Sequence, residues 1–134
     1  MPSPFLCLAT SYWPERPHES RIMNERIRVA IAGASGYAGA ELVRLATAHP
    51  AYNVTAVTSE KSAGQKVAAV FPSLAGVISH TFEALAPEAL IDRADAIFLA
   101  LPHTKSQDPV AHCRKAGKLV VDLSADYRLK DRSE

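Results

Sequence analysis

A short apolar run that leads directly into three evenly spaced glycines constrains the fold more than any other feature. The run at residues 27–32 reads Ile-Arg-Val-Ala-Ile-Ala, and the next seven residues read Gly-Ala-Ser-Gly-Tyr-Ala-Gly. A short continuous apolar run is typical of a strand buried in a parallel sheet. Because a helical stretch follows, the sequence predicts a strand, a glycine turn and a helix that hold the pyrophosphate of a dinucleotide.

Each residue type in this turn has an expected role. Gly33 permits the tight turn, Gly36 lets the backbone approach the pyrophosphate, and Gly39 allows close packing of the helix on the sheet. Ser35 offers a hydroxyl to the cofactor. Tyr37 belongs to the same cofactor-binding set, although packing alone would also explain it. A glycine turn that serves only packing is the alternative for the whole run.

The rest of the chain alternates between strand and helix patterns. We expect further strands at residues 53–58, 77–82, 96–101 and 118–123, separated by a helix that ends near His49, a short helix at 87–91 and a helix from Asp108 to Gly117. Strands that alternate with helices over short connections predict right-handed crossovers. The expected fold class is therefore α/β, a Rossmann-like doubly wound parallel sheet.

The predicted domain covers residues 26–134. Residues 1–25 hold four prolines and no regular period, which predicts a disordered N-terminal extension, or a non-native one because Met23 lies just before the first strand. A sheet that ends with the strand at 118–123 would leave an edge and an apolar face uncovered. We therefore expect an incomplete NAD(P)-binding domain, truncated before a substrate and catalytic domain.

Charge and cysteine content narrow the function classes. The net charge is only +1, which favours a small-molecule substrate over nucleic acid or membrane as a partner. The apolar stretches are too short to span a bilayer. Cys7 and Cys113 fit no metal spacing, so no metal site is expected. A cytoplasmic protein without disulfides is the resulting expectation.

The end of the second strand bears on the choice of cofactor. An NAD-binding domain usually places a carboxylate here, which bonds the ribose 2′-hydroxyl. This chain has Thr58 and Ser59 at the strand tip and Lys61 nearby, a set that suits the 2′-phosphate of NADP. Glu60 complicates the assignment, because it could be the ribose carboxylate if the strand ended one residue later. NADP is preferred over NAD, and Lys61 has a solvated loop lysine as its alternative.

Four blocks in order resemble one family. The blocks lie at residues 31–42, 58–64, 98–103 and 121–129, the last reading Val-Asp-Leu-Ser-Ala-Asp-Tyr-Arg-Leu. Together they resemble the N-acetyl-gamma-glutamyl-phosphate reductases of arginine biosynthesis, within the semialdehyde dehydrogenase family. The resemblance runs from about residue 27 to residue 131, and this part of the chain is similar to the N-terminal NAD(P)-binding portion of these enzymes.

The resemblance implies a reaction and a division of roles along the chain. These reductases attack an acyl phosphate with a cysteine thiolate, release phosphate, and reduce the thioester to an aldehyde with NADPH. The family's nucleophile follows the Ala-Asp-Tyr-Arg block in a Pro-Gly-Cys segment, and its catalytic histidine comes later still. This chain stops at Glu134, before both. Because Cys113 falls in a predicted helix and Cys7 in the N-terminal extension, no catalytic residue is expected here. The chain alone should bind cofactor without turnover, and the full-length enzyme should form a homo-oligomer.

Four residues extend the implied site. Pro102 and His103 end a strand at the carboxyl edge of the sheet, where they would face the cofactor. Asp126 and Arg128 follow the last strand, where the family's active site would place them on the substrate side. For His103 the alternative is a loop histidine bonded to the backbone, and for the other pair a local ion pair. Thr104 replaces the glycine of many relatives, which puts the approach of this loop to the nicotinamide in question.

Two other functions remain open. Aspartate-semialdehyde dehydrogenase, or a lysine-pathway relative acting on a carrier-bound acyl phosphate, shares the fold and the thioester chemistry. Tyr37 and the Ser-Ala-Asp-Tyr-Arg-Leu run favour the arginine enzyme over both. A non-catalytic nucleotide-binding module is the third hypothesis. A Walker-type phosphate loop is disfavoured, because Ala-Glu rather than Lys-Ser or Lys-Thr follows Gly39.

Overall fold

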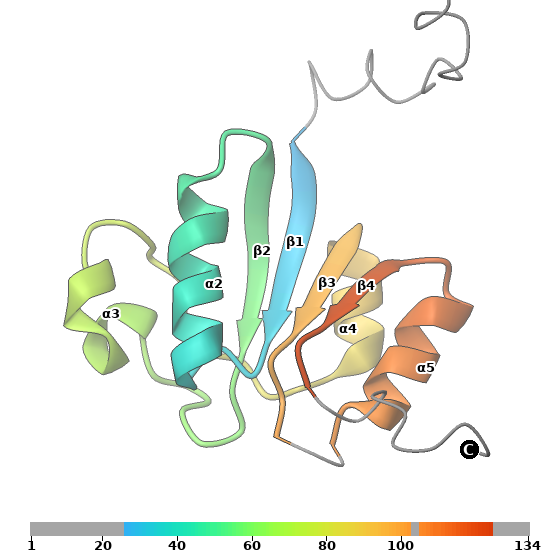
Figure 1. The fold of residues 1–134 in the computed structure, drawn as a ribbon. Helices are drawn as coiled ribbons and strands as arrows, with labels where there is room; N and C mark the ends of the chain where they lie inside the picture. Colours follow the sequence, from blue (N-terminus) through green and yellow to red (C-terminus); the bar gives the residue numbers. More distant parts are fainter. Residues whose placement is uncertain (1–25, 103–104, 125–134) are drawn as a thin grey trace, which may run out of the picture.

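The computed structural model describes residues 26–102 and 105–124, and a four-stranded parallel sheet forms its centre (Figure 1). The strands are β1 (Ile27–Ala32), β2 (Tyr52–Thr58), β3 (Ala96–Leu99) and β4 (Leu119–Asp122), arranged in the order β2-β1-β3-β4. Strand β1 therefore pairs with β2 on one side and with β3 on the other. The strand order reverses direction at β1, so the predicted doubly wound parallel sheet is confirmed.

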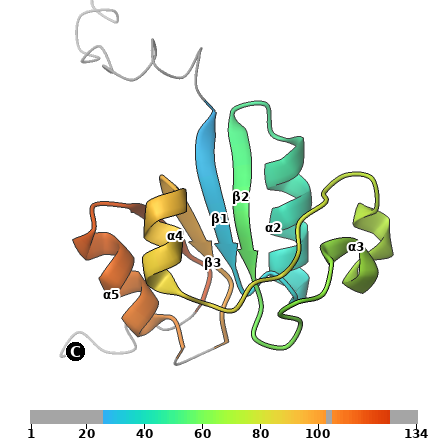
Figure 2. The same cartoon turned by 180° about the vertical axis from the view of Figure 1, so that it is seen from behind.

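Helices cover both faces of this sheet (Figures 1 and 2). Helix α2 (Tyr37–Ala48) and the short helix α3 (Val67–Val70) lie on one side, and helices α4 (Pro87–Arg93) and α5 (Gln107–Lys115) lie on the other. Each connection between parallel strands carries at least one of these helices, as a crossover requires. None of the helices in the described part of the chain is long and apolar enough to span a membrane.

The alternating side chains of β1 divide the core into two clusters. Val29 and Ile31 face α2 and pack in one cluster with Val43. Ala30 and Ala32 face the opposite side and belong to the cluster that contains residues of α4 and α5. All four β1 residues are fully buried. This central strand, covered on both faces, fixes the position of the turn that follows it.

The prediction of a strand at residues 77–82 is wrong. In this segment only Thr81 takes part in a β-bridge, an isolated one with Lys66. The backbone N–H of Phe82 donates to the carbonyl of Gln65, so the segment hydrogen-bonds to the turn before α3. The apolar residues of the segment still supply core contacts, which is why the sequence resembles a strand.

Two further differences from expectation concern helices. Residues 60–76, where no helix was predicted, contain α3 and a turn of 3-10 helix η1 (Pro72–Leu74). Helix α5 begins at Gln107 with Ser106 at its N-cap, two residues before the predicted cap at Asp108. Asp108 instead lies in the first turn, where its negative charge interacts favourably with the helix dipole.

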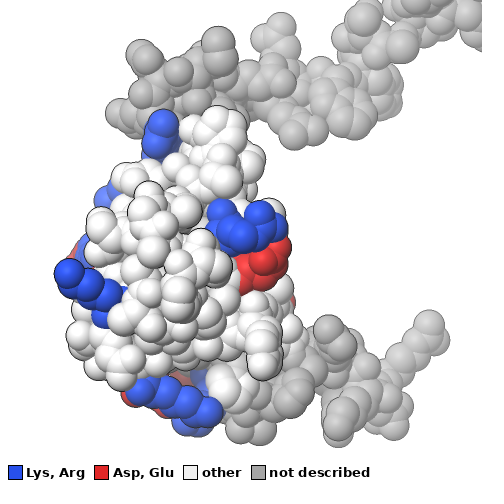
Figure 3. Space-filling model, turned by 90° about the vertical axis from the view of Figure 1, so that its left-hand side faces the viewer, with Lys and Arg blue, Asp and Glu red and all other residues white. Residues whose placement is uncertain are grey.

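The outer strand β4 leaves apolar surface exposed. Leu119 and Val121 of β4 and Leu123, the residue just after it, are 65%, 38% and 44% exposed. Figure 3 shows the side of the molecule that carries α3, where charged side chains lie scattered among uncharged residues.

Candidate functional site

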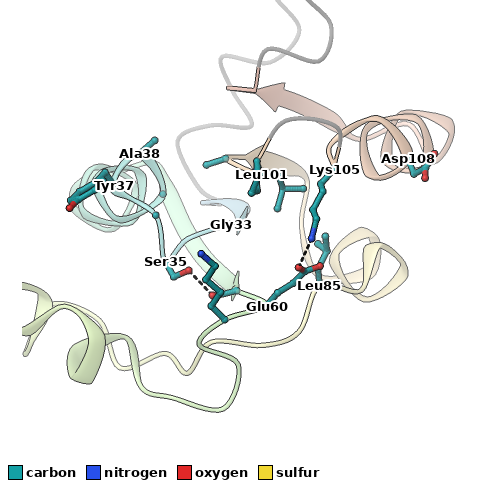
Figure 4. Close-up of a pocket in the computed structure, with 15 residues that line it drawn as sticks. Gly33, Ser35, Tyr37, Ala38, Glu60, Leu85, Leu101, Lys105 and Asp108 are labelled. Carbon is teal, nitrogen blue, oxygen red and sulfur yellow. Dashed lines mark hydrogen bonds and ion pairs between the residues drawn. The ribbon is translucent and has the colours of Figure 1, made fainter.

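A cavity of about 680 Å³ opens at the carboxyl ends of the central strands, beside the point where the strand order reverses. In open α/β sheets this is where ligands bind. The glycine turn, the end of β2 and the segment after β3 all contribute to its walls (Figure 4). The lining residues are Gly33, Ser35, Gly36, Tyr37, Ala38, Gly39, Ser59, Glu60, Lys61, Leu85, Ala100, Leu101, Pro102, Lys105 and Asp108.

Two of the three glycines are required by the chain itself. Gly33 has a φ of 77°, and a Cβ there would lie 2.4 Å from the carbonyl oxygen of Ala100. A Cβ on Gly39 would lie 2.3 Å from the carbonyl oxygen of Gly33 and 2.6 Å from the Cα of Ala34. Gly39 therefore lets α2 start against the backbone of its own turn, which sharpens the packing role expected for it.

Gly36 differs from its two neighbours. Its φ of −80° is open to any residue, and the nearest atom to an added Cβ is the Gly33 carbonyl oxygen at 3.8 Å. The chain alone therefore gives no steric reason for glycine at a position that lines the cavity. The first turn of α2 also holds no acidic residue, and no side chain caps it. Its N–H groups and dipole suit a phosphate group at this position.

Hydrogen bonds tie the glycine turn to the end of β2. The Ser59 hydroxyl donates to the Ser35 hydroxyl at 2.6 Å and accepts the Ser62 N–H at 3.1 Å. The Ala34 N–H donates to the Thr58 carbonyl at 2.9 Å. Thr58 is otherwise buried, does not line the cavity, and its hydroxyl has no hydrogen-bond partner among the described residues. Thr58 and Ser59, both expected at the strand tip, are both buried, but only Ser59 lines the cavity.

Charged side chains form the rest of the rim. The Lys105 ammonium lies 3.1 Å from a carboxylate oxygen of Glu60, and Lys61 and Asp108 also line the cavity. Figure 4 shows Lys105 and Glu60 pointing toward one another from different segments. Lys105 was not among the predicted site residues, although its position after a strand at the carboxyl edge of the sheet was a usable signal. Tyr37 is 99% exposed, so packing does not explain this residue.

The structure places some predicted site residues and not others. Pro102 and Lys61 line the cavity, as do the turn residues described above. His103, Asp126 and Arg128 lie outside the described residues, so their expected roles remain predictions.

A bidentate ion pair between Arg93 and Glu83 lies next to the cavity wall at the end of β2. Arg93, at the end of α4, donates to both carboxylate oxygens of Glu83 at 2.6 and 3.0 Å and to the Thr55 carbonyl at 2.7 Å. The hydrogen bond from Arg93 holds the pKa of Glu83 below its usual range. The Glu83 carbonyl in turn accepts the Ser59 N–H at 2.9 Å. The pair therefore links β2, α4 and the cavity wall.

The thiol of Cys113 is not placed for nucleophilic chemistry. It is fully buried in α5, where burial, followed by the Glu88 charge, raises its pKa. Because the thiolate is the reactive form, a buried thiol with a raised pKa is inert. No group of three or more His, Cys, Asp or Glu side chains gathers as a metal site within residues 26–102 and 105–124.

The sequence matches one family over most of its length. The family described as "Semialdehyde dehydrogenase, NAD binding domain" covers residues 28–133. The chain belongs to this family. The expectation drawn from the four sequence blocks is confirmed at the level of the family.

Relatives of known name are similar over the same region. The chain is 53% identical to the N-acetyl-gamma-glutamyl-phosphate reductase of Geotalea daltonii over 108 residues, which is 81% of this chain and 31% of that protein. It is 44% identical to the [LysW]-L-2-aminoadipate/[LysW]-L-glutamate phosphate reductase of Saccharolobus solfataricus over 109 residues, again 81% of this chain and 31% of the relative. The chain thus spans less than a third of the length of these two relatives.

Solved structures share the fold. The aspartate semialdehyde dehydrogenase of Candida albicans, solved with NADP, superposes with a TM-score of 0.67 at 23% identity, over 79% of this chain and 32% of that one. GenD2 from gentamicin A biosynthesis, solved with NAD, gives 0.58 at 25% identity, over 75% and 27% of the two chains. The Rossmann-like fold is therefore confirmed.

Proposed function

We propose that this chain is the NADP-binding portion of an N-acetyl-gamma-glutamyl-phosphate reductase. The parent enzyme would reduce N-acetyl-glutamyl phosphate to N-acetyl-glutamate semialdehyde and release phosphate. The 53% identity to a reductase of that name and the family match support this reading. We further propose that residues 26–134 form one NAD(P)-binding domain.

The binding proposal depends mainly on the open space around the Cα of Gly36. Packing within the chain does not require glycine at this position, which lines the cavity. A ligand that must approach the backbone closely would explain the glycine. In this arrangement Gly36 and the first turn of α2 would hold the pyrophosphate. Ser59 and Lys61 would hold the adenosine end, and the segment that ends at Pro102 would lie beside the nicotinamide.

The bound nicotinamide would supply the hydride that reduces the acyl carbon. The residues of this chain would do other work, because they bind and orient the cofactor. The apolar stretch of Ala100 and Leu101 in the cavity wall would exclude water from one side of it. The buried Cys113 would not supply the nucleophile, which would come from elsewhere in the parent enzyme.

We prefer NADP to NAD because Ser59 and Lys61 line the cavity at the tip of β2. A 2′-phosphate needs donors and positive charge, which these residues supply. Titration of the 134-residue chain with NADPH and with NADH tests the preference. Tighter NADPH binding supports it, and equal or tighter NADH binding contradicts it.

The absence of turnover is a separate part of the proposal. Phosphate-dependent oxidation of N-acetyl-glutamate semialdehyde, followed by NADPH formation, should be undetectable with the purified chain. Measurable turnover would contradict the assignment of catalysis to residues outside this chain.

The lysine-pathway reading keeps a specific observation in its favour, the 44% identity to the LysW-dependent reductase. Both reductases act on an acyl phosphate, and they differ in whether the acyl group is attached to a carrier. A full-length protein that contains this chain should accept the free N-acetyl substrate. Activity confined to a carrier-bound substrate would favour the lysine-pathway reading instead.

A further inference from the structure

An ion pair joins two segments of the cavity rim that are far apart in sequence. Glu60 follows the end of β2, whereas Lys105 lies just before α5, and their charged groups are 3.1 Å apart. Both side chains line the cavity and point toward one another (Figure 4). The pair therefore belongs to the same site as the glycine turn.

Glu60 stands where it can influence the choice of cofactor. Ser59 is the first residue after β2, and Glu60 comes next, at the strand tip where a carboxylate usually accepts bonds from the ribose hydroxyls of NAD. An unpaired carboxylate at this place repels a 2′-phosphate, because both groups are negatively charged. Glu60 by itself is thus a feature of an NAD site.

We propose that Lys105 sets the cofactor preference by masking the Glu60 carboxylate. With the ammonium bound, the carboxylate presents little net charge to the 2′-phosphate of NADP, and one of its oxygens is already engaged. Lys105 is thus a specificity-determining residue for the site, and the inference rests on the proposed function. It also removes the conflict between Glu60 and the NADP preference.

The exposure of the pair makes the idea testable without loss of the fold. Lys105 and Glu60 are 56% and 60% exposed, and ion pairs this exposed contribute little to stability. Neither side chain takes part in a core cluster of the described residues. Substitutions at both positions should therefore leave the melting temperature close to that of the unaltered chain.

The experiment measures the dissociation constants of NADPH and NADH for four forms of the 134-residue chain. These are the unaltered chain, Lys105→Met, the double variant Lys105→Met with Glu60→Gln, and Lys115→Met as the control. Lys115 is an exposed lysine at the far end of α5 and does not line the cavity. It matches Lys105 in charge and in the substitution made.

Masking predicts a change in the ratio of the two affinities. Lys105→Met should weaken NADPH binding about tenfold and leave NADH binding equal or tighter, because the exposed carboxylate repels only the 2′-phosphate. The double variant should regain most of the lost NADPH affinity, since the repelling charge is gone. Lys115→Met should bind both nucleotides as the unaltered chain does.

Other outcomes overturn the inference. Equal loss of NADPH and NADH affinity in Lys105→Met would mean that Lys105 contacts the pyrophosphate, which both cofactors share. A double variant no better than the single one would mean that Lys105 binds the 2′-phosphate directly. If the unaltered chain prefers NADH, and Lys105→Met still lowers NADPH affinity relative to NADH affinity, the NADP proposal is refuted and the masking inference is supported. Failure to bind either nucleotide would refute both.

Discussion

The two rims of the cavity are built in different ways. On the glycine side, backbone atoms set the geometry, because a Cβ on Gly33 or Gly39 would meet backbone at 2.4 or 2.3 Å. On the opposite side, exposed side chains set it, and Glu60 and Lys105 meet through a single ion pair. The first rim cannot change without moving α2 against β1, whereas the second can change with a rotation of side chains.

This difference separates two tasks within one site. A rigid backbone rim suits the pyrophosphate, which NAD and NADP share. An adaptable charged rim suits the part of the cofactor in which the two differ. Substitutions at Gly33 or Gly39 should therefore change stability, and substitutions on the charged rim should change cofactor preference. Ser59, which bonds to Ser35 across the junction of β2 and the turn, belongs between these extremes.

The largest loss of stability should come from Gly39→Ala. The new methyl group would lie within 3 Å of the backbone of Gly33 and Ala34, so α2 must shift from its place. We expect the free energy of unfolding to fall by about 3 kcal/mol, measured by chemical denaturation. A Gly39→Ala variant as stable as the unaltered chain would show that the turn is not rigid.

Ser59→Ala should have an intermediate effect. The substitution removes the hydrogen bond to Ser35 and leaves the Ser62 N–H without its acceptor. Ser59 is only 3% exposed. A loss of about 1–2 kcal/mol is expected in the free energy of unfolding. Ser73→Ala, at an exposed serine of η1, is the control and should change little. Equal effects of the two substitutions would refute a role for Ser59 in joining the rims.

Glu83→Gln should have the smallest effect, and one that depends on pH. The pKa of Glu83 is lowered by its hydrogen bonds with Arg93, so its ionised form is stabilised by folding. Its contribution is present above the usual carboxyl pKa and is lost as the pH falls through the lowered value. Because both side chains are about 40% exposed, we expect only about 0.5–1 kcal/mol at pH 7.

The stability difference between Glu83→Gln and the unaltered chain should shrink steadily below about pH 4. Thermal unfolding from pH 7 to pH 3 measures it. Asp92→Asn, on the exposed side of α4, serves as the control. A difference that grows as the pH falls would have the opposite sign and would contradict the assigned role of the pair.

The sequence predicts the glycine rim well because its determinants are local. A buried strand, three glycines and a helix follow one another within residues 27–48, and the structure reproduces that order. The alternation of apolar and helical segments likewise predicted the parallel sheet and its edge. These patterns depend on neighbours in the chain, which a single sequence displays directly.

The features that the sequence did not reveal depend on distant partners. Residues 77–82 have the composition of a strand, but Phe82 hydrogen-bonds to Gln65 instead of extending the sheet. The pairing of Lys105 with Glu60 joins positions 45 residues apart. At the end of β2, Thr58 and Ser59 are both buried, but a difference of one residue puts only Ser59 in the cavity wall. Neither spacing nor composition determines contacts of this kind.

Gly36→Ala tests the central claim most directly, because Gly36 is the one turn glycine that the fold does not require. The melting temperature and the NADPH dissociation constant should be measured on the same preparation. We predict a melting temperature within a few degrees of the unaltered chain and NADPH binding weakened at least about tenfold, since the methyl group would occupy the space of the pyrophosphate. Unchanged NADPH binding by a folded Gly36→Ala chain would contradict the assignment of this turn as the cofactor cradle.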